Sequence, residues 1–127
     1  MKIMLQLGSI IGALAVGIGA FGAHALKASL EASGRADTFE TAVKYQFYHA
    51  LAIVLIGVLL TRADIGAIKW LNWAGYAFAG GVLIFSGSLY AICFTGITKF
   101  GAVAPIGGLL MIAGWILLFL AAGKMDF

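Results

Sequence analysis

Residues 45–60 read YQFYHALAIVLIGVLL, an apolar segment that begins with two tyrosines, a glutamine and a histidine. The next charged residue is Arg62. A helix needs roughly 20 residues to cross the hydrocarbon core of a bilayer. The helix must therefore begin earlier, and Asp37-Thr38-Phe39-Glu40 resembles a capping box, an acceptor side chain followed three residues later by Glu. We expect a helix over residues 38–61, with its first two turns outside the hydrocarbon.

The composition of the whole chain indicates an integral membrane protein. Of 127 residues, 63% are hydrophobic and 10% are charged, against about 45–50% and 25% in a soluble domain. A globule of this size cannot hide so much apolar surface. The net charge of +3 comes from Lys and Arg scattered at segment ends, so we expect no nucleic acid partner. The expected partner is the lipid bilayer.

Four apolar segments are long enough to span, and they predict an all-α, integral membrane four-helix bundle. We expect residues 1–127 to form a single transmembrane domain with spans at about 3–26, 38–61, 71–94 and 102–122. The first span is too long for a signal peptide, so we expect it to be retained. Lys27–Asp37 lies between the first two spans and predicts a short amphipathic helix at the interface, ended by Ser33-Gly34. Pro105 falls in the first turn of the last span, where it is tolerated.

Small residues recur four positions apart in the first span, as in Gly8-xxx-Gly12 and Gly19-xxx-Ala23. Such spacing lets helix backbones approach closely. We therefore expect the first span at the centre of the bundle. We also expect Gly12→Leu to disrupt folding or assembly more than Gly57→Leu.

Polar side chains gather at one face of the membrane. Four spans joined by short loops alternate in direction, so the end of the first, the start of the second, the end of the third and the start of the fourth share a side. Ionisable residues within a membrane suggest a functional site. The candidate polar site comprises His24, Tyr45, Gln46, Tyr48, His49, Ser86, Ser88 and Tyr90. We expect His24 and His49 to lie at a similar depth, about one turn inside the hydrocarbon.

Each of these residues also has a structural interpretation. A neutral histidine can bridge helices through a hydrogen bond, and an interfacial tyrosine can anchor the chain. We expect His49 and Tyr45 to point into the bundle, with a hydrogen-bond partner for His49 from the first span, the third span or water. Glu40 and Lys44, four residues apart, predict a surface ion pair. No soluble-enzyme motif occurs and two histidines make a poor metal site, so we expect no enzyme, no cofactor and no metal.

The strings GAFGAHAL (residues 19–26), ETAVKYQFYHAL (40–51), FSGSLY (85–90) and PIGG (105–108), with Gly114-Trp115, resemble the small YgdD/YwdK-type membrane proteins. The resemblance covers nearly the whole chain, with the motifs in the same order. It implies a multi-pass protein of the bacterial inner membrane with four spans, no established substrate and uncharacterised function. Its signature residues match at His24, Glu40, Thr41, Tyr45, Gln46, Tyr48, His49, Ser86, Tyr90 and Pro105.

Three functions remain to be weighed. The leading hypothesis is binding or transport of a small solute, ion or proton at a one-sided polar site, in a homo-oligomer packed through glycine faces. The alternative is a non-catalytic accessory or assembly subunit of a membrane complex. A lipid-modifying enzyme with His49 as base is the weakest, because no nucleophile or metal constellation supports it. The apolar far halves of the spans favour a pocket over an open channel.

Overall fold

The structure, a computed structural model, describes residues 2–127 and is all-helical over that range. Its elements are α1 (Lys2–Ala23), α2 (Lys27–Ser33), α3 (Ala36–Leu59), α4 (Ile65–Thr95), a short 3-10 helix η1 (Thr98–Ala102) and α5 (Ala104–Ala122). The predicted fold class is confirmed.

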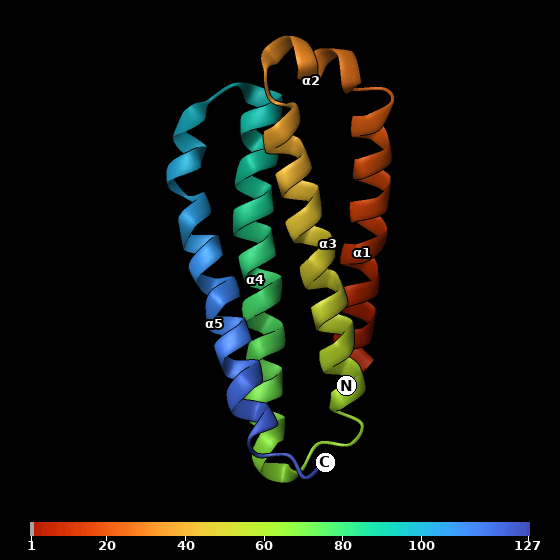
Figure 1. The fold of residues 1–127 in the computed structure, drawn as a ribbon, viewed down its shortest axis with the longest axis vertical. Coiled ribbons are helices and arrows are strands. Elements are labelled where there is room, and N and C mark those ends of the chain that lie inside the picture. Colours follow the sequence, from red (N-terminus) through yellow and green to blue (C-terminus); the bar gives the residue numbers. More distant parts are fainter. Residues whose placement is uncertain (1) are drawn as a thin grey trace.

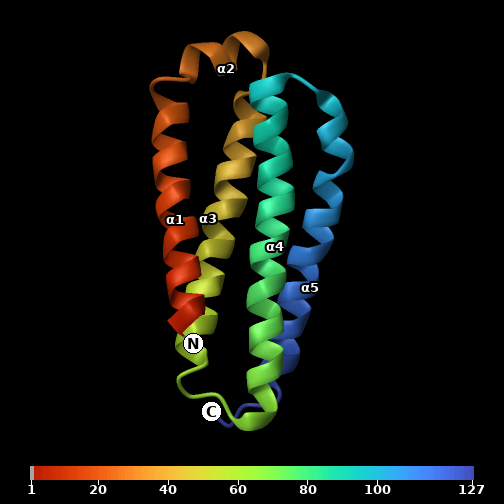
Figure 2. The ribbon, with the colours of Figure 1, turned by 180° about the vertical axis from the view of Figure 1, so that it is seen from behind.

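The four long helices stand side by side in the order α1, α3, α4, α5 (Figures 1 and 2). Each packs mainly against its neighbour in this order. The short helix α2 lies across the end where α1 finishes and α3 begins, and both chain ends lie at the opposite end (Figure 1). There the backbone N–H of Asp126 donates to a carboxylate oxygen of Asp64, at 2.9 Å, and ties the C-terminal tail to the start of α4.

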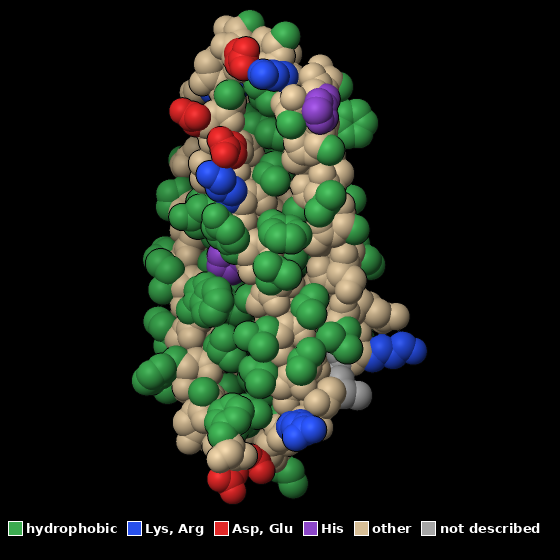
Figure 3. All heavy atoms as spheres, turned by 45° about the vertical axis from the view of Figure 1, so that its right-hand side comes forward, with side chains coloured by type: hydrophobic (Ala, Val, Ile, Leu, Met, Phe, Trp, Pro, Cys, Tyr) green, Lys and Arg blue, Asp and Glu red, His purple; other side chains and the backbone are tan. Residues whose placement is uncertain are grey.

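Each long helix has the length and composition to span a membrane, with η1 and α5 counted as one segment. Charged side chains gather towards the two ends of the molecule, and hydrophobic side chains cover the band between them (Figure 3). At a rise of about 1.5 Å per residue, α4, with its 31 residues, is longer than the bilayer core is thick. It must therefore tilt or extend beyond the hydrocarbon.

Most predicted boundaries lie within two or three residues of the observed ones, but one predicted capping motif and one boundary differ. The capping box is wrong: α3 begins at Ala36, its N-cap Arg35 makes no side-chain cap bond, and Asp37 lies in the first turn. The third span begins at Ile65 rather than residue 71, because the apolar stretch before Trp70 continues the helix.

The predicted interfacial segment is a helix that stops where the sequence indicated. Gly34 adopts a positive φ of 71°, a conformation that glycine tolerates without strain. The N–H groups of Gly34 and Arg35 donate to the carbonyls of Glu31 and Leu30, which closes the last turn. The side chain of Leu30, which belongs to α2, is buried. Pro105 lies in the first turn of α5, as expected.

The central helix is α3, and the prediction that the first span would be central is wrong. In the most apolar 18 residues of each helix, 44% are buried in α3 and 17% in α1. The reason is the order of the helices: α1 stands at the flank and packs mainly on α3, so much of its surface faces outwards. Small residues four apart permit close approach but do not specify which helix is surrounded.

The core is apolar and lies towards the end opposite α2. Its fully buried side chains include Met4 from α1, Ile53 and Ile56 from α3, and Leu71 and Phe78 from α4. Ala121 of α5 completes the cluster. All four long helices therefore close around side chains that carry no hydrogen-bonding group.

Glycine allows a close backbone contact between α4 and α5. A Cβ built on Gly107 would lie 2.7 Å from the carbonyl oxygen of Gly81 and would also overlap the backbone of Phe85. A Cβ on Gly81 would meet the carbonyl oxygen of Gly107 at 2.9 Å. The backbones touch directly here, so neither residue can carry a side chain without moving a helix.

The same geometry reverses the expected ranking of Gly12 and Gly57. A Cβ on Gly57 would lie 2.8 Å from the side chain of Leu5 and 3.0 Å from its backbone nitrogen. A Cβ on Gly12 would make only an ordinary contact, 3.7 Å, with Ala50. The structure therefore predicts that Gly57→Leu is the more damaging change.

The adjacent glycines of α5 provide a matched test of the close contact. We predict that Gly107→Ala lowers the free energy of unfolding by about 1–3 kcal/mol, because the added methyl group overpacks a backbone contact. Gly108→Ala should be neutral or slightly stabilising, because its Cβ would meet only Phe85, at 4.0 Å, and alanine favours helix. Unfolding titrations in detergent would measure both, and equal losses would contradict the assignment.

Candidate functional site

The side-chain amide of Gln46 joins three helices. Its Nε2 donates to the carbonyl oxygen of Ile11 in α1 at 3.0 Å, and its Oε1 accepts from the hydroxyl of Tyr90 in α4 at 2.6 Å. Gln46 is only 5% exposed. An unpartnered amide would be costly in hydrocarbon, so these two bonds account for a glutamine in an apolar helix.

The two candidate serines have different partners. Ser86 is buried and donates from α4 to the carbonyl oxygen of Ala42 in α3, at 2.7 Å. Ser88 donates to the carbonyl of Ile84 one turn earlier in its own helix. Ser86 and Tyr90 therefore bond between helices, whereas Ser88 satisfies its hydroxyl locally.

His49 is buried, and both of its ring nitrogens have partners. The indole N–H of Trp115 in α5 lies 3.1 Å from Nε2, and the carbonyl oxygen of Tyr45 lies 2.8 Å from Nδ1. An indole nitrogen can only donate, so Nε2 accepts and Nδ1 carries the hydrogen that Tyr45 receives. This arrangement requires the neutral ring. His49 points into the bundle as expected, but its partner comes from the fourth span, which was not among the partners expected.

The two candidate tyrosines of α3 lie at the surface. Tyr45 is 41% exposed and packs against Phe85, with ring centroids 4.8 Å apart. Tyr48 is 55% exposed, and its hydroxyl has no hydrogen-bond partner among residues 2–127. The inward orientation expected for Tyr45 is therefore only partly met.

His24 does not join His49, which corrects the expectation that both lie at a similar depth. His24 is exposed, in the turn between α1 and α2. Gly22, two residues earlier, packs against Phe39, and His49 follows Phe39 by ten residues in α3. At about 1.5 Å per residue, His49 lies about 15 Å deeper along the bundle. Because His24 lies in the turn after α1, it is closer to the α2 end of the molecule than its place in the sequence suggested.

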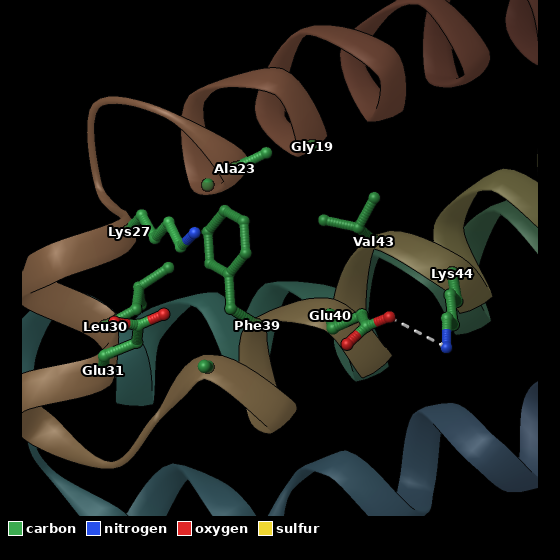
Figure 4. Close-up of a pocket in the computed structure, with 11 residues that line it drawn as sticks. Gly19, Ala23, Lys27, Leu30, Glu31, Phe39, Glu40, Val43 and Lys44 are labelled. Carbon is green, nitrogen blue, oxygen red and sulfur yellow. Dashed lines mark ion pairs between the residues drawn. The ribbon is translucent and has the colours of Figure 1, made fainter.

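A pocket lies beneath α2, where α1 ends and α3 begins, and we call it the α2 pocket. Its volume is about 430 Å³, within the range of about 300–1,000 Å³ typical of ligand sites. Leu30, Phe39 and Val43 supply apolar walls, and Gly19 and Ala23 supply the α1 side (Figure 4). The small side chains of α1 leave the space that the pocket occupies.

Four charged side chains line the α2 pocket: Lys27 and Glu31 from α2, and Glu40 and Lys44 from α3 (Figure 4). The predicted ion pair is confirmed, with Lys44 Nζ 3.0 Å from Glu40 Oε1 and both side chains exposed. Such a pair contributes under about 1 kcal/mol to stability. Both charges therefore remain open to a ligand.

The buried polar residues leave little free chemistry. In residues 2–127, every buried side-chain nitrogen and oxygen has a hydrogen-bond partner, and no group of three His, Cys, Asp or Glu side chains could hold a metal ion. The candidate residues thus divide into a bonded set inside the bundle (Gln46, His49, Ser86, Ser88, Tyr90) and an exposed set on its surface (His24, Tyr45, Tyr48, Glu40, Lys44).

Residues 18–108 match the family described as proteins of unknown function, DUF423. The chain belongs to this family. It is similar to the UPF0382 membrane proteins SH2409 of Staphylococcus haemolyticus and YwdK of Bacillus subtilis, at 44% and 38% identity. Each comparison covers 98% of both chains. No solved structure matches.

These matches confirm the expected family and a multi-pass membrane protein. The names of the family and of these relatives state no biochemical role.

Sequence reasoning missed Trp115, Lys27, Glu31, Phe39 and Leu30 as residues of the two polar regions. A signal existed for Trp115, because an indole N–H deep in an apolar span needs an acceptor. The pocket residues had no such signal, because the space arises from how α2 folds back over α1 and α3.

Two tyrosines test the bridge at Gln46. We predict that Tyr90→Phe lowers the free energy of unfolding by about 1 kcal/mol, because it leaves Gln46 Oε1 buried without a donor. Tyr48→Phe removes a hydroxyl that has no partner in the structure and should change stability little. Thermal unfolding of both variants in the same detergent would measure this. Similar melting temperatures for the two would argue against the bridge.

The bond between His49 and Trp115 predicts energetic coupling. We expect a double-mutant cycle of His49→Ala and Trp115→Phe to give a coupling of about 0.6–1.7 kcal/mol, the range for hydrogen bonds between membrane helices. A cycle is needed because His49 also packs against Phe78, with ring centroids 5.3 Å apart. Additive losses in equilibrium unfolding would exclude the bond.

Proposed function

We propose that this DUF423 protein binds a small charged solute in the α2 pocket and does not conduct one through the bundle. The observation that carries the proposal is the pocket itself, a volume of about 430 Å³ with charges of both signs at one end of a membrane bundle. Binding follows from the apolar walls and charged rim, a common composition for ligand sites.

The interior of the bundle argues against conduction. Below the level of His49, the fully buried side chains are apolar, among them Ile53, Ile56, Leu71 and Phe78. A path for an ion needs a continuous track of polar groups or water. His49 is a poor proton carrier in this setting, because a hydrogen on Nε2 would face the N–H of Trp115.

A variant that fills the pocket tests the proposal directly. We predict that the full chain, in detergent, binds glycerophosphoethanolamine saturably in isothermal titration calorimetry. This probe is small and carries charges of both signs. Ala23→Trp should abolish the binding, because Ala23 is an exposed residue at the pocket wall that can accept a larger side chain without disturbing the core.

Ala13→Trp is the matched control, because Ala13 is an exposed alanine of α1 outside the described pockets. It should bind like the wild type. The proposal fails if the wild type does not bind, or if Ala23→Trp binds equally well. Proton flux into liposomes, followed with an enclosed pH-sensitive dye, should equal that of protein-free liposomes. A flux above that level would favour transport instead.

A further inference from the structure

The α2 pocket continues into a second cavity along the same side of the bundle. This lower cavity has a volume of about 300 Å³ and is lined by Ala15 and Val16 of α1 and by Phe47 and Tyr48 of α3. The two cavities share Gly19, Val43 and Lys44. Together they form one groove between α1 and α3, which we call the α1–α3 groove.

The character of the groove changes along its length. Its upper part, the α2 pocket, carries four charged side chains. In the lower part Lys44 is the one charged lining residue and the rest are apolar or aromatic. Phe47 follows Phe39 by eight residues in α3, so the groove reaches about 12 Å further towards the hydrocarbon. A charged head with an apolar continuation matches an amphiphile.

The charges of the pocket specify the kind of head group. Two cations and two anions line it, so their formal charges cancel. Glu40 and Lys44 pair with each other, and Glu40–Lys44 is the single ion pair within residues 2–127. Lys27 and Glu31 therefore have no ionic partner there, and they suit a ligand that brings one negative and one positive group.

We propose that the α1–α3 groove holds a membrane phospholipid of the phosphatidylethanolamine type. Its phosphate would lie by Lys27, its primary ammonium by Glu31, and an acyl chain would follow the lower cavity. This inference rests on the proposed function and names the ligand class of that pocket. A primary ammonium offers N–H donors to carboxylates, which a trimethylammonium group does not.

The preference of the groove for one lipid over another must come from the head group. Inside a bilayer the lipid tails are as apolar as the side chains of the groove, so an acyl chain gains no hydrophobic free energy by entering it. The charged rim is then the part that distinguishes one lipid from another. An anionic lipid without an amine would leave Glu31 without a partner.

The test uses the full chain reconstituted in vesicles of equal parts phosphatidylethanolamine, phosphatidylglycerol and phosphatidylcholine, with co-purified lipid counted by native mass spectrometry. We expect phosphatidylethanolamine to be enriched about fivefold, the ratio that a partly exposed ion pair supports. Glu31→Gln should move the preference towards phosphatidylglycerol, because the pocket becomes net positive. Lys27→Gln should reduce retention of phosphatidylethanolamine and phosphatidylglycerol.

Lys99→Gln is the matched control, because Lys99 lies at the same end of the molecule, in η1, and does not line the groove. It should leave the lipid ratio unchanged. Val16→Trp should lower lipid retention while free glycerophosphoethanolamine still binds, because it blocks only the lower cavity.

Three results overturn the inference. They are equal retention of the three lipids, the same ratio in Glu31→Gln as in the wild type, and full retention by Val16→Trp. If the free head group still binds the wild type in these cases, the proposed function stands and the lipid assignment alone fails. If the free head group binds neither the wild type nor the control Ala13→Trp, both fail.

Discussion

The hydrogen bonds of Gln46 hold together three of the four long helices. Lipid cannot satisfy a polar group, so a glutamine in a membrane helix must find its partners within the protein. Here one side-chain amide engages the backbone of α1 and the hydroxyl of Tyr90 in α4. The bond from His49 to Trp115 extends the connection to α5. Polar residues in the middle of α3 thus fix its neighbours, whereas Glu40 and Lys44 near the start of α3 are exposed.

Small residues have two different roles in the bundle. On one side, α4 and α5 meet backbone to backbone at Gly81 and Gly107. On the other side, Gly19 and Ala23 of α1 leave a space beside α3, and α2 covers that space. Small residues therefore have two different consequences: they allow close contact at Gly81 and Gly107, and they leave space at Gly19 and Ala23. The pocket exists because α1 presents small side chains where α3 presents Phe39 and Val43.

Much of the fold could be predicted from the sequence, because the length of an apolar segment and the residues that end a helix are local properties of the chain. The four spans, the stop at Gly34 and the pair Glu40–Lys44 depend on residues close in the chain. The partner of His49 could not be predicted, because it depends on how α3 and α5 rotate against each other. The central place of α3 depends on the order in which the helices pack, and the position of His24 depends on the turn after α1.

Both chain ends lie at the end of the molecule opposite α2 (Figure 1), which follows from an even number of crossings. A topology reporter fused to either terminus would therefore sit on the same side of the membrane. That side is the one the α2 pocket does not face, and the tail contact between Asp126 and Asp64 makes the N-terminus the gentler place for the fusion. One such reporter would assign the pocket to the inner or the outer leaflet, and hence to the pool of lipid that it can sample.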